Sequence, residues 1–248
     1  MDVPYFLSKY DPDVLRFYLT AVAPETRDTE ACPERSRRVL LGGFRRAQQQ
    51  PTGGHLGPQS VANRMLSFAY KRFDGHVPEP ALLDDADREL LAQVEAGFET
   101  VGDLLAACKF RAALNEALGL AREANVYLDH KAPWFQIKED RTAAATTVYV
   151  TLRVVDNLKT LLSPFLPHTA QQLHEHLGYD GQLFGTQHVV EYQEETRAHE
   201  ALTYDHAGAI GTWAPSQLPA GQALRQPAPL FRKLDESVIE EECARLEG

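Results

Sequence analysis

The sequence predicts an all-α fold, an antiparallel helix bundle followed by an irregular C-terminal tail. Apolar residues recur every three to four positions through the middle of the chain, and short turns with glycine or proline separate these segments. This periodicity fades after Gly178. Hydrophobic residues make up 44% of the 248 residues, which is enough for a sizeable core.

The first predicted element is a short helix that begins at Pro12. Asp11 is a suitable N-cap, and Pro12 fits the first helical position, where its missing N–H costs nothing. Pro24 cannot continue the hydrogen-bond ladder, so the helix should stop near it. The apolar stripe of this helix consists of Val14, Leu15, Tyr18 and Leu19.

Residues 31–60 interrupt the pattern. We predict an aberrant, disordered insertion there, without stable secondary structure. The basic residues between Arg35 and Arg46 could form an RNA-binding arm, but an accidental sequence is the better interpretation. The residues that break every possible period are Gly42, Gly43, Gln48, Gln49, Gln50, Pro51, Gly53 and Gly54.

The bundle is predicted over residues 61–178. Asp84, Asp85 and Asp87 open its second helix, where carboxylates cap N–H groups and favour the helix dipole, so we interpret them as caps and not as a catalytic pair. The predicted helices span 61–70, 85–108, 111–128, 142–162 and 168–177. The expected inward positions are Val61, Met65, Phe68, Ala69, Leu90, Leu91, Val94, Phe98, Val101, Leu104, Leu105, Cys108, Leu114, Ala117, Leu118, Ala121, Leu128, Val148, Leu152, Val155 and Leu158.

The tail, residues 179–248, is rich in glycine, proline, glutamine and threonine. We expect it to pack back on the bundle as irregular chain, with brief extended stretches such as 188–192. A short charged helix is predicted over 235–246.

The composition excludes several classes of protein. No apolar run approaches the roughly 18–20 residues that span a bilayer, and the N-terminus lacks the features of a signal peptide. Cys32, Cys108 and Cys243 form no CxxC pair, which argues against disulfides and zinc knuckles. His174 and His176 lie on different sides of a helix and should not converge on a metal, and no other metal site is predicted. We therefore expect a cytoplasmic protein without a membrane partner.

The formal net charge of −10 bears on nucleic-acid binding. A protein that binds polyphosphate by bulk electrostatics should be basic, because affinity follows the number of phosphates neutralised. If this chain binds RNA, a local site must read the bases. DNA is not an expected partner.

Three segments in order resemble one known family. The first is YDPDVLRFYL at 10–19 with APETRDTE at 23–30, the second is Asn63-Arg64 with LSF at 66–68 and KRFDG at 71–75, and the third is NVYLD at 125–129 with KAPW at 131–134. The resemblance continues through LFRKLD at 230–235. The chain is similar to the methionyl-tRNA synthetase family of class I aminoacyl-tRNA synthetases, over nearly everything except 31–60.

The resemblance implies a domain order and a binding site. Residues 1–30 would be a remnant of the stem-contact segment, and 61–178 the anticodon-binding bundle. Family members read the anticodon CAU of tRNA(Met) from the first and third bundle helices. Arg64, Pro133 and Trp134 match those positions. An unpaired base can stack on an indole and form hydrogen bonds to a guanidinium.

One position departs from the family pattern. Ser60 stands where the family has asparagine, and a hydroxyl cannot present the two-pronged contact of an amide. Without the resemblance, Trp134 would be interpreted as an aromatic plug that closes a helix end, and Arg64 as a solvated arginine.

Residues 31–60 do not match the family pattern, which suggests a frame error in the coding sequence. Family members have a helix there that includes consecutive asparagines, and asparagine codons AAC read one base early become CAA, the glutamine codon of Gln48–Gln50. We hypothesise a short insertion from Ala31 with a frame slip, restored just before Ala62. The lost helix would remove buried apolar surface at about 25 cal/mol per Å², so a destabilised bundle is expected. The nucleotide sequence tests this.

The family's catalytic motifs do not occur in this sequence. The HIGH and KMSKS motifs, which stabilise transferring phosphates, are absent, and no β–α alternation precedes the bundle. The resemblance implies ATP and magnesium for the family's catalytic domain and no cofactor for this chain. We expect no catalytic residues and no aminoacylation by this chain alone.

Three functions remain open. The first is a truncated methionine–tRNA ligase, expressed or a pseudogene product, that retains its anticodon-binding region. The second is one subunit of a split synthetase, in which a separate catalytic chain docks on residues 1–30. The third is a helical fragment or interaction domain with no RNA role, or the anticodon domain of another class I synthetase.

Overall fold

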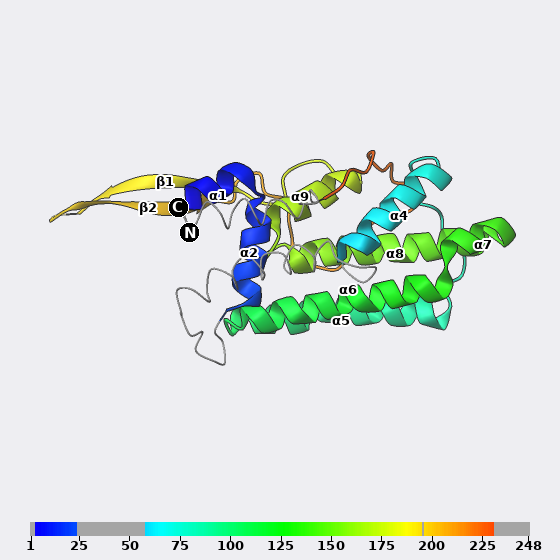
Figure 1. Cartoon of the computed structure of the whole chain (residues 1–248). Coiled ribbons are helices and arrows are strands. Elements are labelled where there is room, and N and C mark those ends of the chain that lie inside the picture. The colour runs from blue at the N-terminus through cyan, green and yellow to red at the C-terminus, as the bar shows by residue number, and fades with distance from the viewer. Residues whose placement is uncertain (1–2, 24–57, 195, 231–248) are drawn as a thin grey trace, which may run out of the picture.

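The computed structural model describes residues 3–23, 58–194 and 196–230. Four long helices, α4 (Pro58–Arg72), α5 (Asp85–Ala106), α6 (Phe110–Lys131) and α8 (Arg141–Leu162), form a bundle (Figure 1). The central helix is α8, which packs against α4, α5, α6 and the shorter α7 (Pro133–Glu139) and α9 (Pro167–His176). The side chains of α8 are accordingly buried along nearly its whole length.

The predicted bundle helices are confirmed, with small differences at their ends. Helix α4 begins at Pro58 and not near Val61, because proline is favoured at a first helical position. The expected inward positions are buried or packed against the core, with one exception. Cys108 is exposed and lies after α5 with a φ of 56°, so its placement on the inward face was wrong. The helical periodicity of apolar residues does not show at which residue a helix ends.

Helices α1 (Val3–Lys9) and α2 (Pro12–Ala21) lie at one end of the bundle (Figure 1). The carboxylate of Asp11 accepts a hydrogen bond from the backbone N–H of Asp13 at 2.9 Å, which confirms the predicted cap of α2. The buried carboxylate of Asp13 in turn accepts bonds from the N–H and hydroxyl of Thr169, at 2.7 and 2.8 Å. Helix α9 thus receives its N-terminal cap from α2. Helix α1 was not predicted. The predicted apolar stripe of α2 was wrong at Leu19, which is exposed, whereas Phe17 is buried.

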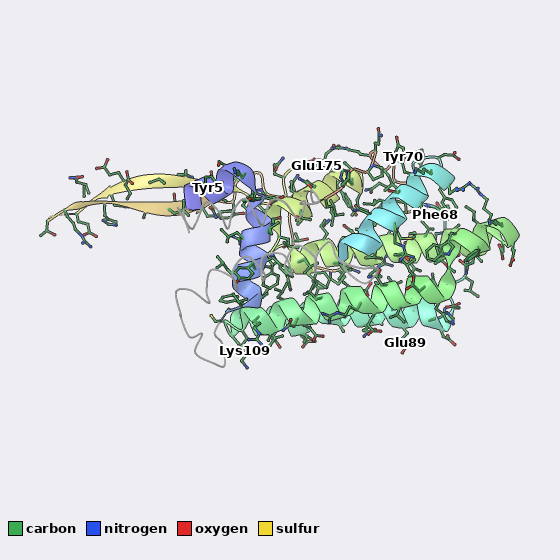
Figure 2. All side chains as sticks on the ribbon, in the orientation of Figure 1. Tyr5, Phe68, Tyr70, Glu89, Lys109 and Glu175 are labelled. Carbon is green, nitrogen blue, oxygen red and sulfur yellow. The ribbon has the colours of Figure 1, made fainter. Side chains whose placement is uncertain are left out.

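The all-α prediction is wrong in one respect. Strands β1 (Thr186–Gln193) and β2 (Ala198–Asp205) pair antiparallel, with Val189 opposite Leu202. The predicted extended stretch 188–192 lies in β1. Neither strand has a buried residue, so no buried face indicated their pairing from the sequence. The hairpin projects from the end of the bundle opposite α7, and its side chains extend into solvent (Figures 1 and 2).

The chain after the hairpin returns to the bundle. Leu218, Leu224 and Leu230 are buried in the same core as the helices. The N–H of Val77, in the loop before α5, donates to the carbonyl of Gln222 at 2.9 Å. Residues 31–57 of the proposed insertion and the predicted helix over 235–246 lie outside the described residues. In the described part of the chain, no helix combines the length and apolarity that crossing a membrane requires.

Candidate functional site

Arg64 and Trp134 come together at the α7 end of the bundle. Arg64 extends from α4, and Trp134 is the second residue of α7. The guanidinium carbon of Arg64 lies 4.6 Å from the centroid of the indole, a cation–π contact. The indole is half-buried and packs against the core. The two residues that resemble the family's anticodon readers are therefore neighbours in space.

The Arg64 guanidinium is only partly satisfied. One terminal nitrogen, Nη2, donates to the Asp129 carboxylate at 3.2 Å. The other, Nη1, is buried without a hydrogen-bond partner among the described residues. An unsatisfied buried donor costs about 1–3 kcal/mol, so this nitrogen has a hydrogen bond to gain from a ligand. The side chain as a whole is 29% exposed.

The position of Trp134 is set by a tight junction between α6 and α7. Ala132 ends α6 and precedes α7 with φ 44° and ψ 62°, the left-handed conformation that non-glycine residues rarely adopt. Pro133 follows as the buried first residue of α7, where its fixed φ suits a helix start. Helix α7 was not predicted, since the expected helices end at residue 128 and begin again at residue 142.

Lys131 fixes this junction to the start of α5. Its ammonium pairs with Asp84 and, at 2.8 Å, with the buried Asp87. Asp84 and Asp87 form a reciprocal capping box on α5, which confirms the predicted capping role. The Tyr127 hydroxyl also donates to Asp87, at 2.7 Å. One cluster of polar side chains thus caps α5 and anchors the last turn of α6.

The protonation states in this cluster follow from its contacts. The hydrogen bond from Lys131 lowers the pKa of Asp84 to about 2. Burial and the bond to the Asp87 carboxylate raise the pKa of Tyr127. Burial opposes the charge on Lys131, but its bonds to Asp84 and Asp87 outweigh that and raise its pKa. The ion pair between Lys131 and Asp84 is therefore intact at neutral pH.

The remaining predicted site residue is Ser60. It lies in the first turn of α4, one turn before Arg64, and its side chain lies outside the described residues. Two exposed residues of α7 were not predicted as part of the site, namely Phe135, whose ring lies against Trp134, and Lys138. An aromatic residue directly after Pro133-Trp134 was the available signal.

The two histidines of α9 have other surroundings. His174 is buried, stacks on Tyr179 and lies 3.5 Å from the Lys159 ammonium. His176 accepts a hydrogen bond from the N–H of Ala228 through Nε2. The described residues include no group of three or more His, Cys, Asp or Glu side chains arranged for a metal ion.

Comparison with known proteins identifies the family. The family model described as the anticodon binding domain of methionyl tRNA ligase matches residues 77–205. The chain belongs to this family. The matched range includes Pro133 and Trp134, whereas Arg64 precedes it.

Relatives and solved structures of methionyl-tRNA ligases agree with this. Methionine–tRNA ligase of Thermomicrobium roseum is 52% identical over 250 residues, and that of Chloroflexus aurantiacus is 48% identical over 244 residues. Each comparison covers 98% of this chain but only 40% and 39% of the respective relative. The apo crystal structure of Mycobacterium tuberculosis methionyl-tRNA synthetase has the same fold, with a TM-score of 0.70 and 24% identity over 95% of this chain and 41% of that one.

Proposed function

We propose that this chain binds the CAU anticodon loop of tRNA(Met), as the anticodon-binding region of a methionine–tRNA ligase. The observation that carries the proposal is the contact of 4.6 Å between the Arg64 guanidinium and the Trp134 indole. It supports binding because a flat apolar face and a fork of hydrogen-bond donors are the groups that recognise unpaired bases.

Trp134 and Arg64 would recognise the loop bases in different ways. The indole offers a stacking face for one splayed loop base, and stacking tolerates any base. The guanidinium offers donors to acceptors on a base edge, which discriminates between bases. Because Nη1 of Arg64 is buried in the free chain, a base can reach it only if the guanidinium or the indole moves. Binding should therefore change the surroundings of Trp134.

The acidic character of the chain limits how it can bind RNA. With a net charge of −10, long-range attraction to RNA contributes little, and the loop bases must supply most of the affinity. The nearby cations Lys138 and Arg141 can contact a few phosphates. We expect a shallow dependence of affinity on salt. The proposed contacts use protein side chains alone and need no cofactor.

The function proposed for this chain is RNA binding and does not include aminoacylation. The chain spans 40% of the length of its relative from Thermomicrobium roseum, and the sequence printed here has neither HIGH nor KMSKS. We propose that any ATP- and magnesium-dependent step is performed by a catalytic domain, in the same polypeptide or in a companion chain that docks on α1 and α2. The exposed Leu7 and Leu19 on these helices favour such docking.

Binding to anticodon stem-loop RNAs tests the proposal. The full chain should bind a stem-loop with CAU more tightly than one with a different anticodon. Trp134→Ala should weaken binding to CAU by about 1–3 kcal/mol, the worth of one stacked base. Arg64→Met should reduce the preference for CAU. Affinity is measured by filter retention or fluorescence titration.

Trp213→Phe provides the matched control. Trp213 lies against Phe98 of α5, and its indole nitrogen donates to the Phe98 carbonyl. Since it is remote from Arg64 in the bundle, its replacement should not change RNA affinity. In this variant Trp134 is the remaining tryptophan, so its emission should shift when RNA binds. Equal retention of cognate and non-cognate stem-loops would refute the proposal and favour a helical domain without an RNA role.

A further inference from the structure

Phe135 is an exposed aromatic residue directly beside Trp134. Its side chain is 62% exposed, although it lies on a helix that packs against α8. The rings of Phe135 and Trp134 have centroids 6.5 Å apart and planes at 64°. Single exposed apolar side chains are common and need no explanation. The position of this one, next to a proposed stacking residue, makes its exposure informative.

The rest of α7 is held in place, so the exposure of Phe135 is not a matter of a loose helix end. Gln136 accepts a hydrogen bond at 2.9 Å from the hydroxyl of Thr147 on α8. Ile137 is half-buried and packs against the core, as does Trp134 on the other side of Phe135. The N–H of Phe135 donates to the Ala132 carbonyl at 2.9 Å. A rigid helix therefore presents the ring to solvent.

A cation lies beside this ring. The Lys138 ammonium is 5.8 Å from the centroid of Phe135, one turn further along α7. Among the described residues Lys138 makes no ion pair. Of the acidic residues that follow it, Asp140 accepts hydrogen bonds from the N–H groups of Thr142 and Ala143 and so caps α8. The Lys138 charge thus remains available to an anionic ligand.

We propose that Phe135 is a second stacking platform, which holds the base next to the one on Trp134, with Lys138 contacting the phosphate of that nucleotide. The inference rests on the proposed function and names a further affinity-determining residue of the same site. Since the two rings are inclined at 64°, the two bases cannot continue one stack. The platform therefore selects a loop whose adjacent bases are splayed apart, a conformation open to single strands and closed to a duplex.

The chemistry distinguishes Phe135 from Arg64. A phenyl ring stacks on any base, so it should contribute affinity without discriminating between bases. Lys138 contributes one phosphate contact, so its removal should reduce the slope of log affinity against log salt by about 0.7. A merely structural role of Phe135 would instead alter the stability of the chain. It would leave the affinity for RNA and the salt dependence of that affinity unchanged.

The experiment measures the affinity of the full chain for anticodon stem-loops, intact and with one base removed at each loop position. Phe135→Ala should weaken binding to the intact loop about tenfold. Phe135→Tyr should restore it, whereas Phe135→Leu, which keeps a large apolar side chain but loses the aromatic face, should not. The loop that lacks the base stacked on Phe135 should bind wild type and Phe135→Ala equally. Leu202→Ala, 65% exposed on the distant hairpin, is the matched control.

The outcomes separate this inference from the proposed function. If Phe135→Ala binds like wild type while Trp134→Ala binds weakly, the second platform is refuted and the proposed function stands. If Phe135→Leu binds like wild type, the contact is apolar and the stacking proposal is also refuted. If neither Trp134→Ala nor Phe135→Ala changes the affinity, the proposed function fails and this inference fails with it.

Discussion

At the scale of single residues, Lys131 has the contacts of a structural anchor. Its side chain is largely buried against Asp87, whose carboxylate also accepts the Tyr127 hydroxyl. Removal of one partner from a buried ion pair leaves the other charged and desolvated, which costs more than the pair contributes. Lys131 directly precedes Ala132-Pro133-Trp134. It therefore stabilises the fold and also holds the proposed site in position.

Lys131→Met should lower the free energy of unfolding by about 3 kcal/mol, because Asp87 would keep a buried charge without its counter-ion. Urea unfolding followed by circular dichroism measures this. Lys138→Met, which removes the same group from an exposed position of α7, should change stability by less than about 0.5 kcal/mol. Similar losses for the two variants would show that the Lys131 ion pairs do not stabilise the fold.

At the scale of elements, the junction between α6 and α7 is the feature that presents the site. Two helices meet at one residue, Ala132, which lies in the left-handed region. A side chain there costs roughly 1–2 kcal/mol relative to the right-handed conformation. The surrounding contacts hold it, since Lys131 is anchored to α5 and Pro133 is buried. A strained residue is thus kept next to the proposed recognition residues.

Ala132→Gly should stabilise the chain by about 0.5–1 kcal/mol, because glycine adopts positive φ without strain, although it also loses more backbone entropy on folding. Thermal unfolding measures this. Ala92→Gly, at an exposed position inside α5, should have the opposite sign and destabilise by about 1 kcal/mol. A destabilised Ala132→Gly would mean that the methyl group of Ala132 packs favourably and outweighs the strain.

At the scale of the whole molecule, a buried polar cluster joins α8, α9 and the chain after the hairpin. Asp156 accepts hydrogen bonds from Lys159, Tyr179 and Ser216. The Lys159 ammonium donates to Nδ1 of His174, so the neutral imidazole carries its proton on Nε2, toward the Asp180 carbonyl. Burial and the positive charge of Lys159 lower the pKa of His174 below 6.5.

The stability of the fold should fall as the pH decreases through the range below about 6.5. The folded state favours neutral His174, so the unfolded chain binds protons more readily and gains from acid. This contribution is complete above the unfolded pKa near 6.5 and is lost as the pH falls toward the lower folded pKa. The hydrogen bond to the Asp180 carbonyl and the carboxylates of Asp156 and Glu175 oppose the lowering of the His174 pKa but do not reverse it.

Thermal unfolding of wild type and His174→Gln between pH 8 and pH 5 measures this. The wild-type midpoint should fall with decreasing pH more steeply than that of the variant. His176, whose pKa is also lowered by burial, should preserve a smaller dependence in the variant. His168→Gln, at an exposed position of α9, is the control. Parallel curves for wild type and His174→Gln would contradict the prediction.

Some features of this structure were predicted from the sequence, and others were not. Helix α5 was predicted to within two residues because a capping box and a continuous apolar stripe both act within a few positions. The resemblance singled out Arg64 and Trp134, and the structure brings them together. Phe135 was missed because its proposed role depends on its neighbours in space. Strands β1 and β2 were missed because neither contains a buried residue.

The sequence by itself determined the bundle helices, since apolar periodicity, caps and proline positions act between near neighbours along the chain. Only the tertiary structure decided the features that join distant residues. Asp13 caps α9 through Thr169, 156 positions away, and no local pattern could indicate that bond. Ala132 adopts a conformation that its own preferences disfavour, because α5, α6 and α8 fix the chain on both sides of it. Long-range packing can hold a residue against its local preference, and at Ala132 it sets the orientation of the proposed recognition surface.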